Sequence, residues 1–522
     1  MERKSTHRIT LTCLLLMLAL ATACGHKAEV PDQATAVETQ ASMFPDYRDI
    51  VIPPNIAPLN FQVRDSGATA AVALLQGDNG QEVLAQADRS MTVRIDTSAW
   101  RGLLTTCKGK DIRVTVYVQT PAGWVKHRPH TLTVANEDID PYLSYRLIEP
   151  GYELYRQLGI YQRNLTNWDE RAVYENNRTY EEEENHCINC HNYRNQSAQD
   201  MLFHVRAHHG GTIIVQNGKA HKVQVKDSTI LSSAVYPAWH PTQDLVAFST
   251  NKTGQIFHAY HAEKLEVMDE ASDMLLYDVS RNEVSHVFRS RDELETFPAW
   301  APSGDRLYYC SAQVGHLIPS ETPDSMRGLK LMQCYDSIYY DLKSVPFNPG
   351  TRTFGEPRTE VHAAIHRHSI TLPRISPDGR YVLYTQGDYG QFHIWHKSSD
   401  LWVKNLQTDS CYNLREANSP DTDSFHSWSS NGRWIAFSSR RIDGNYTRVF
   451  IAYFDRQGHA HKAFLIPQEN PEHNTLLLKS YNVPELTRDA VTISQADLGR
   501  CVRGQDGERA RYRKHLAPAP AK

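Results

Sequence analysis

The chain has 522 residues, which is too long for one compact domain, so we expect two or three domains. Its 56 basic residues are balanced by 60 acidic ones, and the net charge is −4 with no block of basic residues. A nucleic-acid-binding protein needs a positively charged face, so we discount that class. The aromatic content of 10%, rich in tyrosine, suits β-sheets.

The first residues have the pattern of a secretory signal. A basic segment, residues 3–8, precedes an apolar run from Ile9 to Ala23 that is too short to span a membrane. The run ends in Leu20-Ala21-Thr22-Ala23-Cys24, which resembles the lipobox of bacterial lipoproteins, although Ala21 replaces the more usual leucine. In that family the cysteine receives diacylglycerol and becomes the mature N-terminus. The resemblance implies lipidation of Cys24, and an ordinary signal peptide is the alternative.

Either kind of signal takes the protein out of the cytoplasm. Residues 1–23 are then a signal peptide, and the polar residues 24–44 form a tether to the first domain. The residues after Cys24 lack the acidic run that is linked to surface export in such bacteria. We therefore expect a cell-envelope protein that is held by its lipid on the periplasmic face of the outer membrane.

Residues 45–136 have the pattern of a small all-β domain. Alternating or apolar segments are separated by the turn sequences Gly-Asp-Asn-Gly at 77–80 and Thr-Pro-Ala-Gly at 120–123. Strands at such short spacing predict a β-sandwich of the immunoglobulin or fibronectin type III kind. No residue in this domain has a catalytic pattern.

Residues 137–210 are expected to form a linker of short helices and loops around the sequence Cys187-Ile188-Asn189-Cys190-His191. This C-x-x-C-H spacing is the signature for covalent attachment of a c-type haem. The two thiols would bond to the haem, and His191 would bind the iron as proximal ligand. Export agrees with this interpretation, because cytochromes of c type mature outside the cytoplasm. The sequence thus predicts haem c as a cofactor.

Two other interpretations of Cys187 and Cys190 stay open. A C-x-x-C pair also occurs as a redox disulfide, usually at the start of a helix in a thioredoxin-like setting, whereas the flank here is a charged loop. It also occurs as half of a zinc site, which would need two further ligands, and the chain has no second C-x-x-C.

A sixth ligand for the haem iron is expected after the motif. Ser197-Ala198-Gln199-Asp200 has the form of a capping box, and Gly210-Gly211 has that of a helix end. A helix between them would place Met201, His204 and His208 on one face. Thioether and imidazole are common sixth ligands of cytochrome haem, so we predict that one of these three binds the iron. A helix that only packs through its apolar residues is the alternative.

The rest of the chain contains a repeat. Its four copies are Tyr236–Thr250, Phe297–Ser311, Leu372–Thr385 and His426–Ser439. Each copy has a strand, a Pro/Gly turn and an apolar strand, and a second β-pair follows it. Four strands per unit are typical of propeller blades. Residues 212–225 resemble the outer pair of one more blade, whose inner strands could come from residues 476–491. We therefore predict a propeller of five blades over residues 211–492, with six as the alternative, and a polar tail at 493–522.

The repeats resemble the WD40-like repeats of the TolB family, whose core is W-S-P-D-G. The best matches are Ile375-Ser376-Pro377-Asp378-Gly379-Arg380 and Trp300-Ala301-Pro302-Ser303-Gly304. The resemblance implies an envelope protein that binds a protein partner through its propeller. The whole layout resembles TolB-like propeller lipoproteins of Bacteroidetes-type bacteria, in which a haem-motif segment precedes the propeller. TolB itself has an α/β N-terminal domain and no C-x-x-C-H.

Taken together, these patterns predict a mainly β protein with three functional hypotheses. The first is a haem-bearing envelope lipoprotein for electron transfer or for redox or gas sensing, whose propeller binds a partner. The second is an envelope binding or scaffold protein in which Cys187 and Cys190 form a disulfide. The third is an enzyme, but the chain contains neither G-x-S-x-G nor H-E-x-x-H, and a carboxylate pair on the blade loops is the one catalytic device left open.

Overall fold

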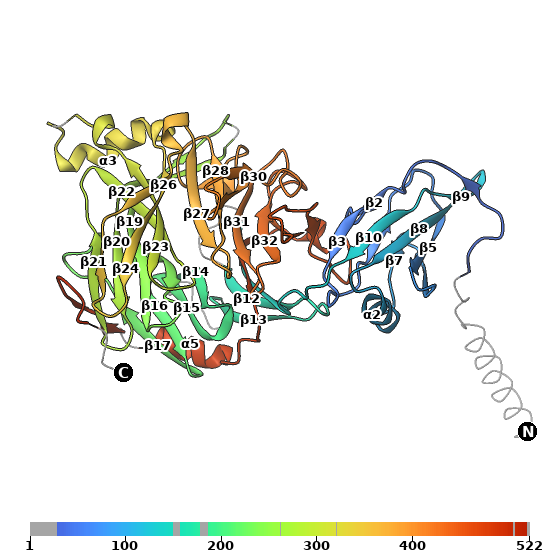
Figure 1. The fold of residues 1–522 in the computed structure, drawn as a ribbon, viewed down its shortest axis with the longest axis horizontal. Coiled ribbons are helices and arrows are strands. Elements are labelled where there is room, and N and C mark those ends of the chain that lie inside the picture. Colours follow the sequence, from blue (N-terminus) through green and yellow to red (C-terminus); the bar gives the residue numbers. More distant parts are fainter. Residues whose placement is uncertain are drawn as a thin grey trace, which may run out of the picture.

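The computed structural model describes residues 29–149, 157–177, 186–261, 263–319, 321–504 and 507–518, and within them the backbone but not the side chain of Cys190. The architecture over these residues is mainly β, as predicted. A small N-terminal domain lies at one end of the molecule, and a larger body of β-sheets follows it (Figure 1).

The N-terminal domain consists of two sheets around one core. The larger sheet contains β1 (Thr35–Ala36), β3 (Ile50–Ile52), β5 (Ala70–Gly77), β6 (Glu82–Gln86), β8 (Asp111–Thr120), β9 (Gly123–Lys126) and β10 (His130–Val134). The smaller sheet contains β2 (Met43–Phe44), β4 (Phe61–Val63) and β7 (Thr92–Val93). Helix α2 (Thr97–Thr106) packs its fully buried Trp100 into the core, where the indole donates a hydrogen bond to the carbonyl of Ile56. This helix was not predicted.

The second body contains six further sheets over the described residues. Blade 1 has β14 (His186–Arg194), β15 (Ser197–Ala207), β16 (Gly211–Gln216) and β17 (Lys219–Gln224). Blade 2 has β18 (Ala234–Trp239), β19 (Leu245–Phe257), β20 (Leu265–Asp278) and β21 (Glu283–Phe288). Blade 3 has β22 (Glu293–Trp300), β23 (Arg306–Gln313), β24 (Asp341–Asn348), β25 (Thr353–Phe354) and β26 (Arg358–Val361).

The remaining blades follow the same order, except for the last. Blade 4 has β27 (Ser369–Ile375), β28 (Tyr381–Gly387), β29 (Asp400–Asn405) and β30 (Cys411–Asn413). Blade 5 has β31 (Asp423–Trp428), β32 (Trp434–Ser439), β33 (Arg448–Tyr453) and β34 (Phe464–Leu465). Blade 6 joins the C-terminal strand β35 (Ser480–Thr487) to β11 (Tyr142–Ile148), β12 (Gly159–Asn164) and β13 (Glu170–Glu175).

The six first strands, β14, β18, β22, β27, β31 and β35, contact one another in this order, and β35 contacts β14, so the described strands close into a ring. The body is therefore a propeller of six blades, which was the alternative to the predicted five. Blade 6 closes the ring, because one of its strands comes from the end of the propeller and three from before its beginning.

Three sequence expectations are corrected here. The expected linker at 137–210 contributes β11 to β15, and the expected helix from Ser197 to Gly210 is wrong because Ser197–Ala207 is strand β15. Met201 and Phe203 face one apolar cluster and Leu202 faces another, so β15 is buried on both sides and lacks the alternation that marks a half-buried strand. The segments 212–225 and 476–491 belong to blades 1 and 6, not to one blade.

The described C-terminal residues, 493–504 and 507–518, include a helix and two short strands that pack on the propeller, and they do not form a polar tail. Helix α5 (Gln495–Arg503) buries Leu498 and Val502 completely against blades 1 and 6. Strand β36 (Glu508–Arg509) then pairs in parallel with β17, and strand β37 (Arg511–Tyr512) pairs in parallel with β21. The two other described helices are α3 (Asp324–Gln333), beside the long strand β20, and the single turn α4 (His473–Leu476).

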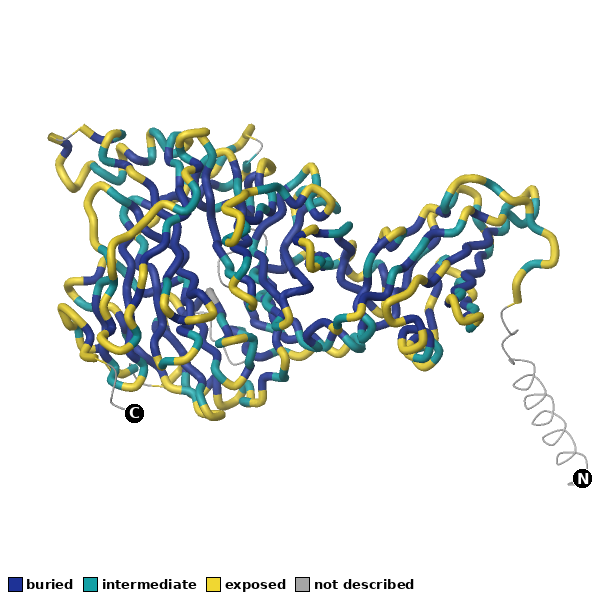
Figure 2. Tube along the Cα trace, viewed as in Figure 1, coloured by how far each residue is buried: buried dark blue, intermediate teal, exposed yellow. Residues whose placement is uncertain are grey.

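The N-terminal domain is joined to blades 5 and 6 by a continuous core. One apolar cluster contains Ile50 and Phe61 of the domain together with Trp434 and Tyr481 of the propeller. Buried residues accordingly continue through the joint (Figure 2). Asp140 adds polar contacts at the joint, since its carboxylate accepts hydrogen bonds of 2.6 Å from the backbone and the hydroxyl of Ser430.

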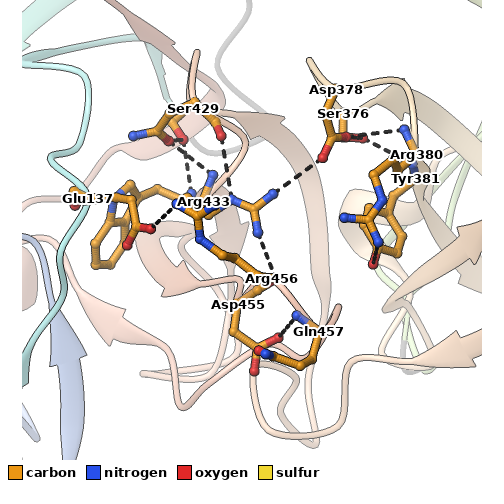
Figure 3. Close-up of polar contacts among 12 residues, drawn as sticks. Glu137, Ser376, Asp378, Arg380, Tyr381, Ser429, Arg433, Asp455, Arg456 and Gln457 are labelled. Atoms are coloured by element: carbon orange, nitrogen blue, oxygen red, sulfur yellow. Dashed lines mark hydrogen bonds and ion pairs between the residues drawn. The ribbon is translucent and has the colours of Figure 1, made fainter.

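The repeated turns are held by local hydrogen bonds (Figure 3). In blade 4 the hydroxyl of Ser376 accepts from the backbone of Tyr381 at 3.0 Å and donates to Asp378 at 2.5 Å. Gly379 follows with φ +70°, a conformation that glycine adopts without strain. Arg433 of blade 5 lies 3.4 Å from the same Asp378 and so links the two turns. Asp378 and Gly379 are thus structural residues of the turn.

Candidate functional site

Each inner strand carries a β-bulge at the same place. Two residues are left unpaired there, for example Tyr236 and Pro237 between the paired residues Val235 and Ala238. The first bulge residue has a positive φ in five blades: Tyr236 (48°), Phe297 (54°), Leu372 (55°), Phe425 (48°) and Val483 (50°). Such a bulge bends the strand and re-aims the side chain that follows it.

The residue after the bulge faces the propeller axis in every blade. These six residues are Asn192, Ala238, Ala299, Arg374, Ser427 and Glu485, and all of them line one cavity of about 520 Å³. We call them the axial ring. A cavity of this volume is in the range of small-molecule sites. The axial ring is therefore the candidate functional site.

Glu485 is the acidic member of the axial ring. Its Oε1 atom accepts hydrogen bonds from the backbone N–H of Tyr193 at 3.0 Å and from the Asn192 amide at 3.1 Å. Burial raises the pKa of Glu485 to about 7, although these two hydrogen bonds favour the ionised form. The charge of nearby Arg374 also favours ionisation. A carboxyl group with this pKa can exchange a proton or accept a cation near neutral pH.

Two arginines complete the charged lining of the cavity. Arg374 belongs to the axial ring, and the hydrogen bonds of its guanidinium include one to the carbonyl of Pro373 at 3.0 Å. Arg488 lies at the rim with an exposed side chain, and its backbone N–H donates to the carbonyl of Gln196. These two residues and Glu485 are the charged residues that line the cavity.

The C-x-x-C-H motif lies on β14, the inner strand of blade 1. Cys187 is 8% exposed and belongs to the apolar cluster that joins blade 1 to residues such as Ile160 and Val173 of blade 6. Cys190 and His191 lie between the paired residues Asn189 and Asn192. They therefore occupy the bulge position that Tyr236 and Pro237 occupy in blade 2.

His191 has a counterpart in blade 5. His426 is the second bulge residue there, and its ring is satisfied by Thr385 at 3.4 Å and by the carbonyl of Leu383 at 3.1 Å. His191 is also buried, at 3% exposure, yet neither of its ring nitrogens has a hydrogen-bond partner of normal geometry among the described residues. Burial lowers the pKa of both histidines to about 3. The backbone of Val483 raises the pKa of His191 and so partly offsets the effect of burial, but its contact with the ring does not have the geometry of a normal hydrogen bond.

The described side chains around the motif do not fit a covalently bound haem. A haem bonded to Cys187 would need apolar space beside the sulfur for its macrocycle, whereas the side chain is packed in the cluster between two blades. His191 lies edge-on to Tyr193, with ring centroids 5.9 Å apart, inside the protein. The motif therefore predicts haem attachment, whereas the packing of Cys187 argues against it.

The three expected sixth ligands are not brought together on one face. Met201 is fully buried on the side of β15 that faces blade 6. His204 is buried three residues later, on the opposite side of the strand, where its Nδ1 atom lies 3.3 Å from the hydroxyl of Thr212. His208 lies in the turn after β15 and is exposed. The strand conformation separates residues that a helix would have grouped.

Cys24, the expected lipidation site, lies outside the described residues. Within the described parts of the chain, no helix has the length and apolar character needed to cross a membrane.

Sequence reasoning missed Arg374 and Glu485. A signal for both was present, because each follows a proline in the sequences Leu372-Pro373-Arg374 and Val483-Pro484-Glu485, where two other copies have Pro-Ala. Aligning the repeats by this proline would have shown a charged residue at a position that is alanine elsewhere.

No protein-family model and no curated protein sequence matches this chain. Solved structures with a similar fold include oligogalacturonate lyase in complex with manganese, with a TM-score of 0.36, 11% identity and coverage of 62% of this chain and 73% of that chain. The β-propeller domain of the Trilobed protease from Pyrococcus furiosus has a TM-score of 0.31 and 9% identity, with coverage of 80% and 95%. An oligogalacturonate lyase from Vibrio parahaemolyticus has a TM-score of 0.29 and 13% identity, with coverage of 81% and 100%.

Proposed function

We propose that this protein is a lipid-anchored binding protein of the cell envelope, of TolB-like type, whose propeller binds a small polar ligand at its axis. The observation that carries the proposal is the axial ring. Six blades place one side chain each on a single cavity of about 520 Å³, and these side chains include a carboxylate, a guanidinium, an amide and a hydroxyl. A few convergent polar groups in a cavity of this volume are the usual features of a ligand site.

The remaining parts of the chain support a binding role. The N-terminal domain shares a core with blades 5 and 6, so it links the propeller to the lipid anchor proposed at Cys24. A protein partner on the outside of the propeller and a position on the periplasmic face of the outer membrane are also part of the proposal. Electron transfer through a haem is not part of it, because Cys187 is packed between blades.

The experiment that tests this function blocks the cavity. Replacing Ala299 by tryptophan fills the axial cavity with an indole side chain from blade 3. Ala122→Trp adds the same side chain on an exposed turn of the N-terminal domain. A library of small polar metabolites is screened by thermal shift with the mature chain. A compound that binds the folded protein raises its melting temperature. We expect compounds that stabilise the wild type and Ala122→Trp but not Ala299→Trp, and equal stabilisation of all three proteins would disprove the axial site.

The anchor has a separate test. Cys24→Ser should move the protein from the membrane fraction to the soluble fraction, because the lipid is attached through that thiol. A wild-type protein that is already soluble would contradict the lipid anchor and leave the axial site unaffected.

A further inference from the structure

We infer that the ligand of the axial cavity is a zwitterion of the size of a short peptide, with its ammonium group at Glu485 and its carboxylate at Arg488. This inference rests on the proposed function and specifies the chemistry of the same site. The three charged residues that line the cavity carry it, together with the distribution of small residues around the ring.

The carboxylate of Glu485, the acidic end of the cavity, can bind a cation. Both protein hydrogen bonds to Glu485 go to Oε1, from Tyr193 and Asn192, and they fix the orientation of the carboxylate. The other oxygen, Oε2, has no hydrogen-bond or ion-pair partner among the described residues. A carboxylate that is enclosed by protein gains most from an opposite charge, and an ammonium group can donate a charge-assisted hydrogen bond to this oxygen.

The arginines that line the cavity, its basic end, can bind an anion. Two guanidinium groups and one carboxylate line the cavity, so the lining has an excess positive charge when Glu485 is ionised. Arg488 makes no ion pair with the described residues and reaches the cavity from its rim. Arginine binds carboxylates through two parallel N–H groups, which gives both affinity and a defined orientation. A ligand with one ammonium and one carboxylate therefore satisfies both ends.

The rest of the lining sets the size and character of the ligand between its ends. Ala238 and Ala299 are the smallest members of the axial ring, and they lie on adjacent blades beside Pro237 and Pro302. This apolar side leaves room for small side chains. Three tryptophans also border the cavity, but they are only 3–8% exposed and so offer no open face on which a sugar or base could stack. Charge, not stacking, is the recognition chemistry here.

The test uses trialanine, which has the two charged ends and only methyl side chains. Its binding to the mature chain is measured by isothermal titration calorimetry, beside N-acetyl-trialanine and trialanine amide, each of which lacks one charge. We expect trialanine to bind at least about tenfold more tightly than either blocked peptide, because each loses a charge-assisted interaction. Equal binding of trialanine and a blocked peptide would overturn the assignment of the corresponding end.

Variants then assign each end to its residue. Glu485→Gln retains the Oε1 acceptor, and we expect it to weaken trialanine about tenfold without changing the binding of N-acetyl-trialanine. Arg488→Met should weaken trialanine and leave trialanine amide unchanged. Glu82→Gln and Arg89→Met, on exposed positions of the N-terminal domain, should change neither. A variant that weakens all three peptides equally would overturn the assignment of that residue.

The inference and the proposed function fail in different ways. If trialanine does not bind while other compounds stabilise the wild type but not Ala299→Trp, the cavity is a binding site and its ligand is not a zwitterion. If no compound distinguishes the wild type from Ala299→Trp, the proposed function fails as well.

Discussion

His191 and His426 occupy the same position in the bulges of blades 1 and 5, and only His426 has partners for its ring nitrogens among the described residues. The equivalence explains why a C-x-x-C-H sequence can belong to a propeller strand. Its last two residues replace an apolar residue and a proline of the repeat. It also makes the two histidines a matched pair for experiments.

Leucine at these two positions should change the stability of the protein by different amounts. His426→Leu removes two hydrogen bonds of a buried imidazole, one of them with the carbonyl of Leu383, so it should cost about 1–3 kcal/mol of unfolding free energy. His191→Leu removes two buried nitrogens that have no hydrogen-bond partner of normal geometry among the described residues, so it should cost less than about 1 kcal/mol or stabilise. Melting temperatures of the two variants provide the comparison. A large loss for His191→Leu would show that its ring binds a group in the native protein.

The packing around Cys187 predicts that the mature protein carries no covalent haem. Protein made in cells with haem-maturation machinery, separated on a denaturing gel and stained for haem peroxidase activity, should show no band at its mass. A known c-type cytochrome from the same cells is the positive control. A band that disappears in Cys187→Ser would contradict this prediction, and it would require blades 1 and 6 to separate around Cys187.

The four blades with a clear repeat could be predicted from sequence because each has a Pro/Gly turn followed by a strongly apolar strand. Blades 1 and 6 could be predicted only in part, because residues 212–225 and 476–491 were expected to form one blade together. In blade 1 the turn residues Asn195 and Gln196 adopt positive φ values of 50° and 56° without glycine. The next strand, β15, is buried on both faces, so Met201, His204 and His208 resembled a helix face. Blade 6 joins strands that are more than 300 residues apart, and no local pattern shows such a pairing.

The functional site, like the strand pairing of blades 1 and 6, could not be predicted from local sequence patterns. The repeat motif was visible, but its charged residues became meaningful only once the bulges of six blades pointed to one axis. Glu485 stands in a strand that lacks the aspartate-glycine turn of the repeat, so residues 476–491 were expected to belong to a blade while Glu485 itself was not singled out. The haem motif, in contrast, was conspicuous in sequence although β14 places Cys187 and His191 in packed positions.

Helix α5 should contribute to the closure of the propeller rather than behave as a tail. Leu498 is fully buried against blades 1 and 6, so Leu498→Ala should cost about 2–5 kcal/mol. Arg500, two residues later, is 70% exposed and pairs with Asp497 on the surface, so Arg500→Ala should cost less than about 1 kcal/mol. Thermal unfolding distinguishes them, and equal midpoints for both variants would mean that the helix does not pack as described.

Glu485 should make the stability of the protein depend on pH in a defined direction. Its pKa rises from 4.5, the ordinary value, to about 7 in the folded protein, because burial disfavours the charged form. The folded state therefore holds this proton more tightly than the unfolded chain does. The stabilising effect is fully present below about pH 4.5 and is lost as the pH rises through 7. Glu485→Gln, which cannot ionise, should gain about 1–3 kcal/mol relative to wild type between pH 4.5 and pH 8. Melting temperatures of both proteins across this range measure the difference. The exposed Glu82→Gln should follow the wild type throughout, and a constant difference between Glu485→Gln and wild type would show that Glu485 does not titrate in this window.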